Sequence, residues 1–127
     1  MRAIDTNLLV RLLVRDDPRQ VGAAERFIAK GAWVSLLVLQ ETTWVLERAY
    51  GLTRKDVALA VELLLEHESL TLETPHIIAP ALADYRASNR VGFSDCLIVA
   101  VARAHGHVPL GTFDKRLSKL ADVEVPS

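Results

Sequence analysis

The amino-acid sequence predicts an α/β fold with a parallel sheet that helices cover on both faces. Short apolar segments of strand length alternate with longer segments of helical periodicity, the pattern of strands joined by right-handed helical crossovers. The chain has 127 residues, of which 50% are hydrophobic. This length supports one hydrophobic core and is too short for two. We therefore expect a single domain over residues 1–127.

The first elements follow from apolar spacing and from helix-start signals. Leucines recur at helical spacing directly after the first predicted strand. Asp17 precedes Pro18, which is the order of a capping carboxylate and a first-turn proline at the start of a helix. The elements expected in this part are a strand at 1–5, helices at 7–14 and 18–30, and a strand at 32–35.

The middle of the chain is expected to form two consecutive helices. The first covers residues 36–50 and stops at Gly51, and Thr53 with Asp56 forms a capping box that starts the second, which reaches residue 67. The remaining elements expected are a strand at 70–73, helices at 76–89 and at 95–104 with Ser94 as N-cap, a strand at 107–112, a short helix at 114–120 and a strand at 123–125.

Composition excludes some classes of protein. No apolar stretch approaches the roughly 18 residues that span a bilayer, and the N-terminus does not resemble a signal peptide. The single Cys96 cannot form an intrachain disulfide. We expect a cytoplasmic protein without a membrane partner. The net charge of −1 does not by itself indicate a nucleic-acid-binding protein.

Four carboxylates mark the candidate site: Asp5, Glu41, Asp95 and Asp114. Asp5 ends the first predicted strand and Asp114 follows the fourth. In open parallel sheets, ligands bind beyond the carboxyl ends of the strands, where the strand order reverses. Each of the three aspartates also has a simpler explanation, because a carboxylate at a helix start caps the helix or is favoured by its dipole.

Glu41 has no capping explanation. Apolar side chains lie one helical turn before and after it, namely Leu37, Val38, Trp44 and Val45. We therefore expect Glu41 to lie within an apolar stripe that faces the core. A carboxylate buried there requires a cation or hydrogen-bond donors, and the alternative is a salt bridge with Arg48.

If the four carboxylates converge, each pair would repel by about 4 kcal/mol at ~4 Å and an effective dielectric of ~20. Bound cations would make such a cluster tolerable. Because all the ligands would be oxygens, hard ions such as Mg²⁺ or Mn²⁺ are expected. These ions activate water and stabilise the leaving oxygen of a phosphodiester.

Four segments together resemble the PIN-domain nucleases, and most closely the VapC-type toxins of toxin–antitoxin pairs. The matching segments are Ile4-Asp5-Thr6-Asn7, Glu41-Thr42-Thr43-Trp44-Val45-Leu46, Phe93-Ser94-Asp95-Cys96-Leu97-Ile98 and Thr112-Phe113-Asp114. The resemblance implies a three-layer α/β/α fold with a five-stranded parallel sheet in the order 3-2-1-4-5. It also implies a Mg²⁺- or Mn²⁺-dependent endoribonuclease.

The resemblance further implies roles for individual residues. Asp5, Asp95 and Asp114 would hold the metal, and Glu41 would complete the cluster and position the attacking water. The side chains expected to donate hydrogen bonds to the carboxylates or to the substrate are Thr6, Asn7, Ser94 and Thr112.

The partners that the resemblance implies are an RNA substrate, tRNA or rRNA, a cognate antitoxin protein, and a second copy of the chain in a homodimer. Two other functions stay open. One is a non-catalytic RNA-binding scaffold with the same fold. The other is a phosphatase with Asp5 as nucleophile, although that class requires a second aspartate where this chain has Asn7.

Overall fold

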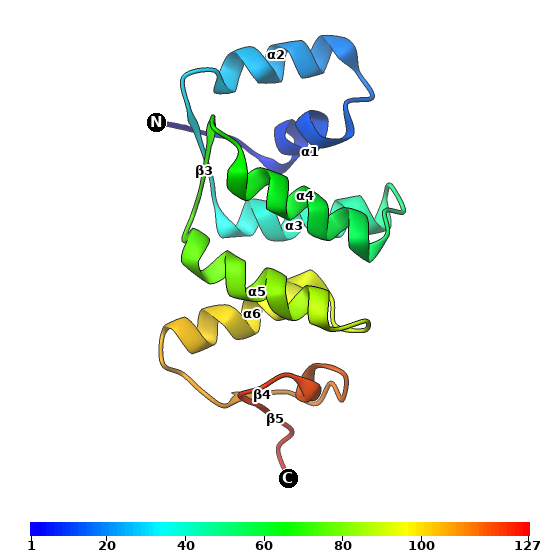
Figure 1. The fold of residues 1–127 in the computed structure, drawn as a ribbon, viewed down its shortest axis with the longest axis vertical. Coiled ribbons are helices and arrows are strands. Elements are labelled where there is room, and N and C mark those ends of the chain that lie inside the picture. Colours follow the sequence, from blue (N-terminus) through cyan, green and yellow to red (C-terminus); the bar gives the residue numbers. More distant parts are fainter. The chain divides into compact units, whose positions relative to one another are not determined.

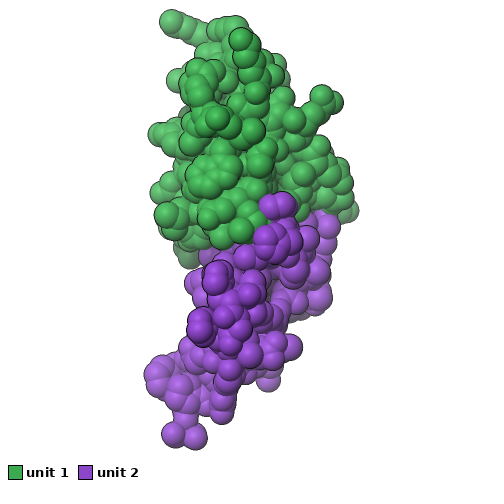
Figure 2. Space-filling view, turned by 90° about the vertical axis from the view of Figure 1, so that its left-hand side faces the viewer, with its two compact units in different colours: residues 1–74 green, residues 75–127 purple.

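A computed structural model describes all residues from 1 to 127, and the chain divides into two compact units. Unit 1 comprises Met1–Thr74 and unit 2 comprises Pro75–Ser127 (Figure 2). The expectation of a single domain stays a prediction. None of the helices has the length and apolar character that crossing a membrane requires.

Unit 1 contains three parallel strands and four helices (Figure 1). In chain order these are β1 (Arg2–Ala3), α1 (Thr6–Val14), α2 (Pro18–Ile28), β2 (Ala32–Val34), α3 (Leu36–Arg48), α4 (Arg54–Glu66) and β3 (Leu70–Leu72). The sheet order is β1-β2-β3. Helix α1 packs against α2 and α3, α3 packs against α4, and α4 packs against β3.

Strands β2 and β3 are buried more deeply on one face than on the other, whereas both residues of β1 are exposed. In β2, Ala32 and Val34 are buried whereas Trp33 between them is 37% exposed. In β3, the same alternation buries Leu70 and Leu72 and exposes the residue between them. Because successive side chains of a strand point to opposite faces, β2 and β3 bury one face of this sheet and leave the other partly exposed.

Unit 2 contains a helix pair and a second, smaller sheet (Figure 1). Its elements are α5 (Pro75–Ala87), α6 (Phe93–Ala104), β4 (Leu110–Gly111), the 3₁₀ helix η1 (Leu117–Lys119) and β5 (Val123–Glu124). Tyr85 of α5 and Phe93 of α6 pack edge to face, with ring centroids 5.7 Å apart. Cys96 is completely buried in α6.

Arg103 ties the helices of unit 2 to the segment that leads into β5. Its guanidinium lies 2.8 Å from the Asp84 carboxylate on α5 and 3.2 Å from that of Asp122. The same side chain donates a hydrogen bond of 2.6 Å to the carbonyl oxygen of Ala121. One cation therefore joins both helices to β5.

The predicted sheet is confirmed in two parts. Strands β1, β2 and β3 reproduce the 3-2-1 part of the order, and β4 pairs with β5 in parallel, as its 4-5 part requires. The chain forms a three-stranded and a two-stranded sheet. A single five-stranded sheet is therefore not confirmed.

Local start signals predict most helix boundaries correctly, with two exceptions. The Asp17 side chain accepts from the backbone of Gln20 at 3.1 Å, and Thr53 accepts from that of Asp56 at 3.2 Å. The predicted N-cap Ser94 is wrong, because α6 begins one residue earlier than Ser94 and is capped by Gly92.

The short helix predicted at 114–120 is also wrong. Only the 3₁₀ turn η1 forms there. Of its three residues only Leu117 is buried, and most helical stability in proteins comes from packing an apolar face. A segment with so little apolar surface to bury gains little from a full α-helix.

Candidate metal centre

Asp5 lies between β1 and α1 and caps the helix. Its backbone is extended, and its Oδ1 accepts a hydrogen bond of 3.0 Å from the Leu8 backbone N–H. The capping explanation is therefore correct. It is compatible with metal binding, because an ionised carboxylate has two oxygens and about four lone-pair positions.

Thr6 connects the first turn of α1 with the middle of α3. Its side chain is buried, and its hydroxyl donates a short hydrogen bond to Glu41 Oε1. This contact fixes one oxygen of the Glu41 carboxylate. In unit 1, Asp5 and Glu41 are thus linked through the adjacent residue Thr6.

The expectation that Glu41 faces the core is wrong. Glu41 is exposed, and its apolar neighbours Leu37 and Trp44 are 79% and 53% exposed. The buried face of α3 consists of Leu39, Thr42, Thr43 and Leu46. Because α3 carries apolar residues on two faces, its periodicity could not decide which face packs against α1 and α4. Burial therefore gives no reason for a cation at Glu41.

Asp114 of unit 2 is held by a network of local hydrogen bonds. Its backbone N–H donates to Thr112 Oγ1 at 3.0 Å. Its Oδ1 accepts from the backbone of Arg116 at 2.8 Å and from that of Leu117 at 3.3 Å. Thr112 and Asp114 therefore hold each other in place at the end of β4.

Asp95 lies in the first turn of α6, where Asp114 affects its charge. Partial burial raises the pKa of the Asp95 carboxyl, and the negative charge of Asp114 raises this pKa further. The positive charge of Arg116 lowers it. Asp95 and Asp114 therefore form a carboxylate pair that is close enough to interact electrostatically.

The donor atoms of both units fit a hard divalent cation. Asp5 and Glu41 in unit 1, and Asp95 and Asp114 in unit 2, offer only carboxylate oxygens, which Mg²⁺ and Mn²⁺ prefer. A cation at the unit 2 pair would relieve its mutual repulsion. Neither unit alone gathers three His, Cys, Asp or Glu side chains in a metal-binding cluster.

Comparison with known proteins identifies the family. The model of the PIN domain matches residues 3–123, nearly the whole chain. The chain belongs to the PIN domain family. It is also similar to Mycobacterium tuberculosis VapC20, a sarcin-ricin loop cleaving toxin, at 24% identity over 100% of both chains and a TM-score of 0.44. No curated protein matches it.

A hollow of about 590 Å³ lies beside Asp5 in unit 1 of this PIN domain. Its lining combines polar and apolar side chains: Asp5, Asn7, Leu8, Arg11, Gln20, Ala23, Ala24 and Phe27. Arg11 is held there by Asp16 at 2.6 Å. Asn7, which the sequence assigns to the substrate side, is exposed and lines this hollow.

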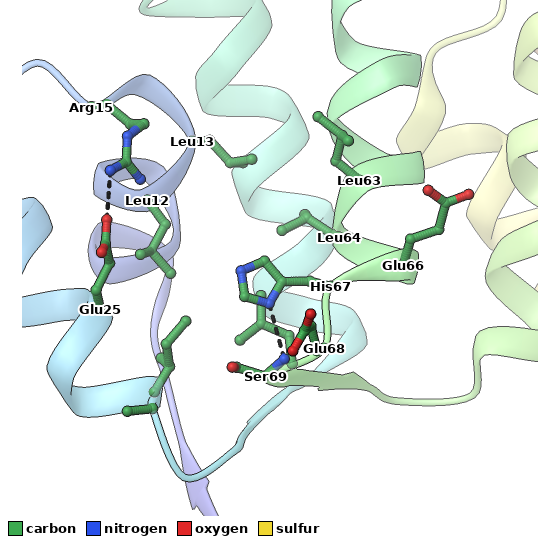
Figure 3. Close-up of a pocket in the computed structure, with 13 residues that line it drawn as sticks. Leu12, Leu13, Arg15, Glu25, Leu63, Leu64, Glu66, His67, Glu68 and Ser69 are labelled. Carbon is green, nitrogen blue, oxygen red and sulfur yellow. Dashed lines mark hydrogen bonds and ion pairs between the residues drawn. The ribbon is translucent and has the colours of Figure 1, made fainter.

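A second hollow of unit 1, of about 820 Å³, contains none of the candidate carboxylates. Figure 3 shows leucines of α1 and α4 projecting into it, among them Leu12 and Leu64. An Arg15–Glu25 ion pair of 2.5 Å lies at its edge. The Ser69 backbone donates to His67 Nδ1 at 3.1 Å. The lining therefore combines leucines with charged and polar side chains.

Sequence reasoning missed one residue beside the candidate site. Phe113, directly before Asp114, is 80% exposed. The signal was available in the sequence, because Phe113 stands in a predicted loop and is followed within three positions by Lys115 and Arg116. An aromatic side chain combined with basic residues is typical of single-stranded nucleic-acid binding.

Proposed function

We propose that this PIN domain is a Mg²⁺- or Mn²⁺-dependent endoribonuclease and the toxin of a toxin–antitoxin pair. The observation that carries the proposal is the Asp95–Asp114 pair, in which partial burial raises the pKa of Asp95 and the charge of Asp114 raises it further. A protein retains such a repulsive pair at a cost, which a bound cation offsets. Membership of the PIN domain family supports the same conclusion.

In the proposed site, Asp5, Asp95 and Asp114 hold the cation and Glu41 positions the attacking water. A bound Mg²⁺ or Mn²⁺ supplies Lewis-acid activation of water and neutralises charge on the phosphate. The water oxygen would attack phosphorus and give up a proton to solvent, the bond from phosphorus to the leaving oxygen would break, and that oxygen would take up a proton from solvent. Thr6 keeps the Glu41 carboxylate oriented through its hydroxyl.

The remaining polar residues have supporting roles in this proposal. Thr112 accepts a hydrogen bond from the Asp114 backbone. It therefore positions Asp114 as a metal ligand without touching the substrate. Asn7 faces the hollow beside Asp5 and contacts the RNA. Ser94 lies next to Asp95 in the first turn of α6 and contacts the substrate phosphate. The proposed substrate is structured cellular RNA, either tRNA or rRNA.

The test compares two aspartates that play the same part in the fold. Asp5 and Asp17 each cap a helix through one carboxylate oxygen, and asparagine caps a helix equally well. Purified wild-type protein, Asp5→Asn and Asp17→Asn are incubated with tRNA and rRNA, with Mg²⁺ or Mn²⁺ and with a chelator. We expect the wild type and Asp17→Asn to cut only with metal, and Asp5→Asn to lose about 100-fold or more of kcat, the scale of removing one transition-state-stabilising group.

Full activity in Asp5→Asn would contradict the proposal. RNA retention without metal-dependent cutting would favour the non-catalytic scaffold. Hydrolysis of a small phosphomonoester, lost in Asp5→Asn, would favour the phosphatase.

The antitoxin is proposed to bind the large leucine-lined hollow of unit 1. Its rim carries the exposed acids Glu66 and Glu68, so it suits a segment with apolar anchors flanked by basic residues. Leu63, which is 53% exposed there, is the place to test this. Leu63→Arg is expected to abolish co-purification with the antitoxin encoded beside this chain and to leave RNA cleavage unchanged. Co-purification of Leu63→Arg at the wild-type level would exclude this binding site.

The chain is proposed to form a homodimer through the exposed apolar side chains of α3. Leu37 and Trp44 are both more than half exposed, and such side chains are more frequent at interfaces than elsewhere on a surface. Trp44→Glu is expected to halve the molar mass measured by light scattering. An unchanged mass would place the interface elsewhere or exclude the dimer.

A further inference from the structure

We propose that Phe113 is a stacking platform for one base of single-stranded RNA, with Lys115 and Arg116 contacting the adjacent phosphates. This inference rests on the proposed function, because it names how that site recognises its substrate. The platform belongs to unit 2 alone, and it adjoins Asp114 in the chain.

The first observation is the exposure of the ring. Phe113 is 80% exposed, more than Trp44 at 53% or any other aromatic residue of the chain, whereas Phe93 in the same unit is 1% exposed. Leaving a phenyl ring in water forgoes the stabilisation that burial provides. Such a residue is therefore expected to contribute to binding and not to the core.

The second observation is that the turn around Phe113 is fixed on both sides. Before it, the Thr112 N–H donates to the Glu124 carbonyl oxygen at 3.0 Å, which continues the pairing of β4 with β5. After it, the Asp114 N–H donates to the Thr112 hydroxyl, and the Ser118 N–H donates to the Asp114 carbonyl oxygen, each at 3.0 Å. The ring is thus carried by a preorganised backbone, so little ordering is needed when a ligand binds.

The third observation is the charge beside the ring. Lys115 and Arg116 are exposed, and the Arg116 side chain retains 65% of its accessible surface. An aromatic ring for the base, with cations for the phosphates, is the combination that binds single-stranded nucleic acid. A protein-binding patch would instead need further apolar side chains in the turn, and the exposed residues that follow Phe113 are charged.

The chemistry also restricts the form of the RNA. Bases in a duplex already stack on their neighbours, whereas bases of loops and ends are free to stack on an aromatic side chain. The platform therefore selects an unpaired nucleotide near the scissile phosphate. It has no hydrogen-bonding edge, so it accepts any base.

Binding is measured apart from cleavage, with a single-stranded oligoribonucleotide that contains 2-aminopurine and with chelator present. The proteins compared are wild type, Phe113→Ala, Phe113→Trp and, as control, Val108→Ala, since Val108 is also an exposed apolar residue of unit 2. We expect Phe113→Ala to raise Kd by about 5- to 100-fold, the range for losing one stacked base. Phe113→Trp and Val108→Ala are expected to keep the wild-type Kd within about 2-fold, because tryptophan also stacks on bases.

Two further readouts separate stacking from a general structural effect. The 2-aminopurine fluorescence is expected to be quenched by wild type and Phe113→Trp, and not by Phe113→Ala. With metal, Phe113→Ala is expected to raise KM for RNA and to leave kcat within about 3-fold, because stacking contributes uniform binding.

An unchanged Kd and unchanged quenching in Phe113→Ala would overturn the proposal. So would a lower molar mass of Phe113→Ala in light scattering with unaltered RNA binding, because it would assign Phe113 to a protein interface. If Phe113-dependent binding occurs and no metal-dependent cleavage is found, the platform stands and the nuclease proposal fails. If metal-dependent cleavage occurs and Phe113→Ala changes neither cleavage nor RNA binding, the nuclease proposal stands and the platform proposal fails.

Discussion

The carboxylates of unit 1 and those of unit 2 differ in how the surrounding chain stabilises them. In unit 1, Asp5 accepts from a backbone N–H and Glu41 accepts from the Thr6 hydroxyl. In unit 2, burial and the charge of Asp114 both act against ionisation of Asp95, and Arg116 opposes them. The acids of unit 1 therefore each have a hydrogen-bond donor, whereas the repulsion within the pair of unit 2 is not fully compensated.

A bound metal ion is therefore expected to stabilise the two units to different extents. In unit 1 hydrogen bonds already orient the carboxylates. A cation there would activate water but would add little to the stability of the fold. In unit 2 a cation would remove repulsion that the fold leaves in place. Three measurements test this difference between the units.

The largest effect is expected from the cation itself. A ligand present at 100 times its Kd stabilises the native state by about 2.7 kcal/mol, so Mg²⁺ or Mn²⁺ at that excess should raise the Tm of the wild type. The rise in Tm should nearly vanish in Asp95→Asn, a change in unit 2, and persist in Glu41→Gln, a change in unit 1. Differential scanning calorimetry with and without metal measures both. Equal shifts in the two variants would show that the units contribute alike.

An intermediate effect is expected from the Thr6–Glu41 hydrogen bond. Thr6→Val removes the hydroxyl and is expected to lower the free energy of unfolding by about 1 kcal/mol and kcat by about 10-fold, with KM unchanged. Thr6→Ser keeps the donor and should retain both.

The double variant Thr6→Val with Glu41→Gln tests whether these losses come from the shared hydrogen bond. Residues in contact give non-additive changes, so the double variant should lose less than the sum of the two single losses. Fully additive losses would mean that the bond does not connect the two helices in solution.

The smallest effect is expected in the pH dependence of stability without metal. Because the pKa of Asp95 is raised in the folded protein, the folded state binds this proton more tightly than the unfolded state. The contribution of Asp95 to stability is therefore fully present below the ordinary Asp pKa of about 3.9. It is lost as the pH rises through the raised pKa.

Asp95→Asn removes this loss. Its Tm relative to wild type is thus expected to increase from pH 3 to neutral pH, by a few degrees at most, in chelator. A Tm difference that is constant across this range would contradict the raised pKa.

Local signals of the sequence predict much of this fold because they act within one helical turn. Asp17, Thr53 and Asp5 each cap a helix as their side-chain chemistry requires. The segment at 114–120 shows the limit of such signals, because Asp114 closes a local turn while too little apolar surface follows to stabilise a helix.

Contacts between distant residues were not predictable in the same way. The exposed face of α3 around Glu41 is as apolar as the buried one, so only its packing against α1 and α4 decides the orientation. The Thr6–Glu41 bond joins residues 35 positions apart and follows from that packing. The four acids could be singled out by residue type and position. The burial and hydrogen bonds of each acid depend on neighbours that the periodicity of the sequence does not reveal.

The single thiol of the chain allows local opening in unit 2 to be measured. Cys96 is completely buried in α6, so a thiol reagent can reach it only when that helix region opens. Because the chain has no other cysteine, the labelling rate in native buffer reports the opening equilibrium of the region around α6. Slower labelling upon addition of Mn²⁺ would indicate, without any nuclease assay, that the ion stabilises this region. Asp95 is the residue directly before Cys96.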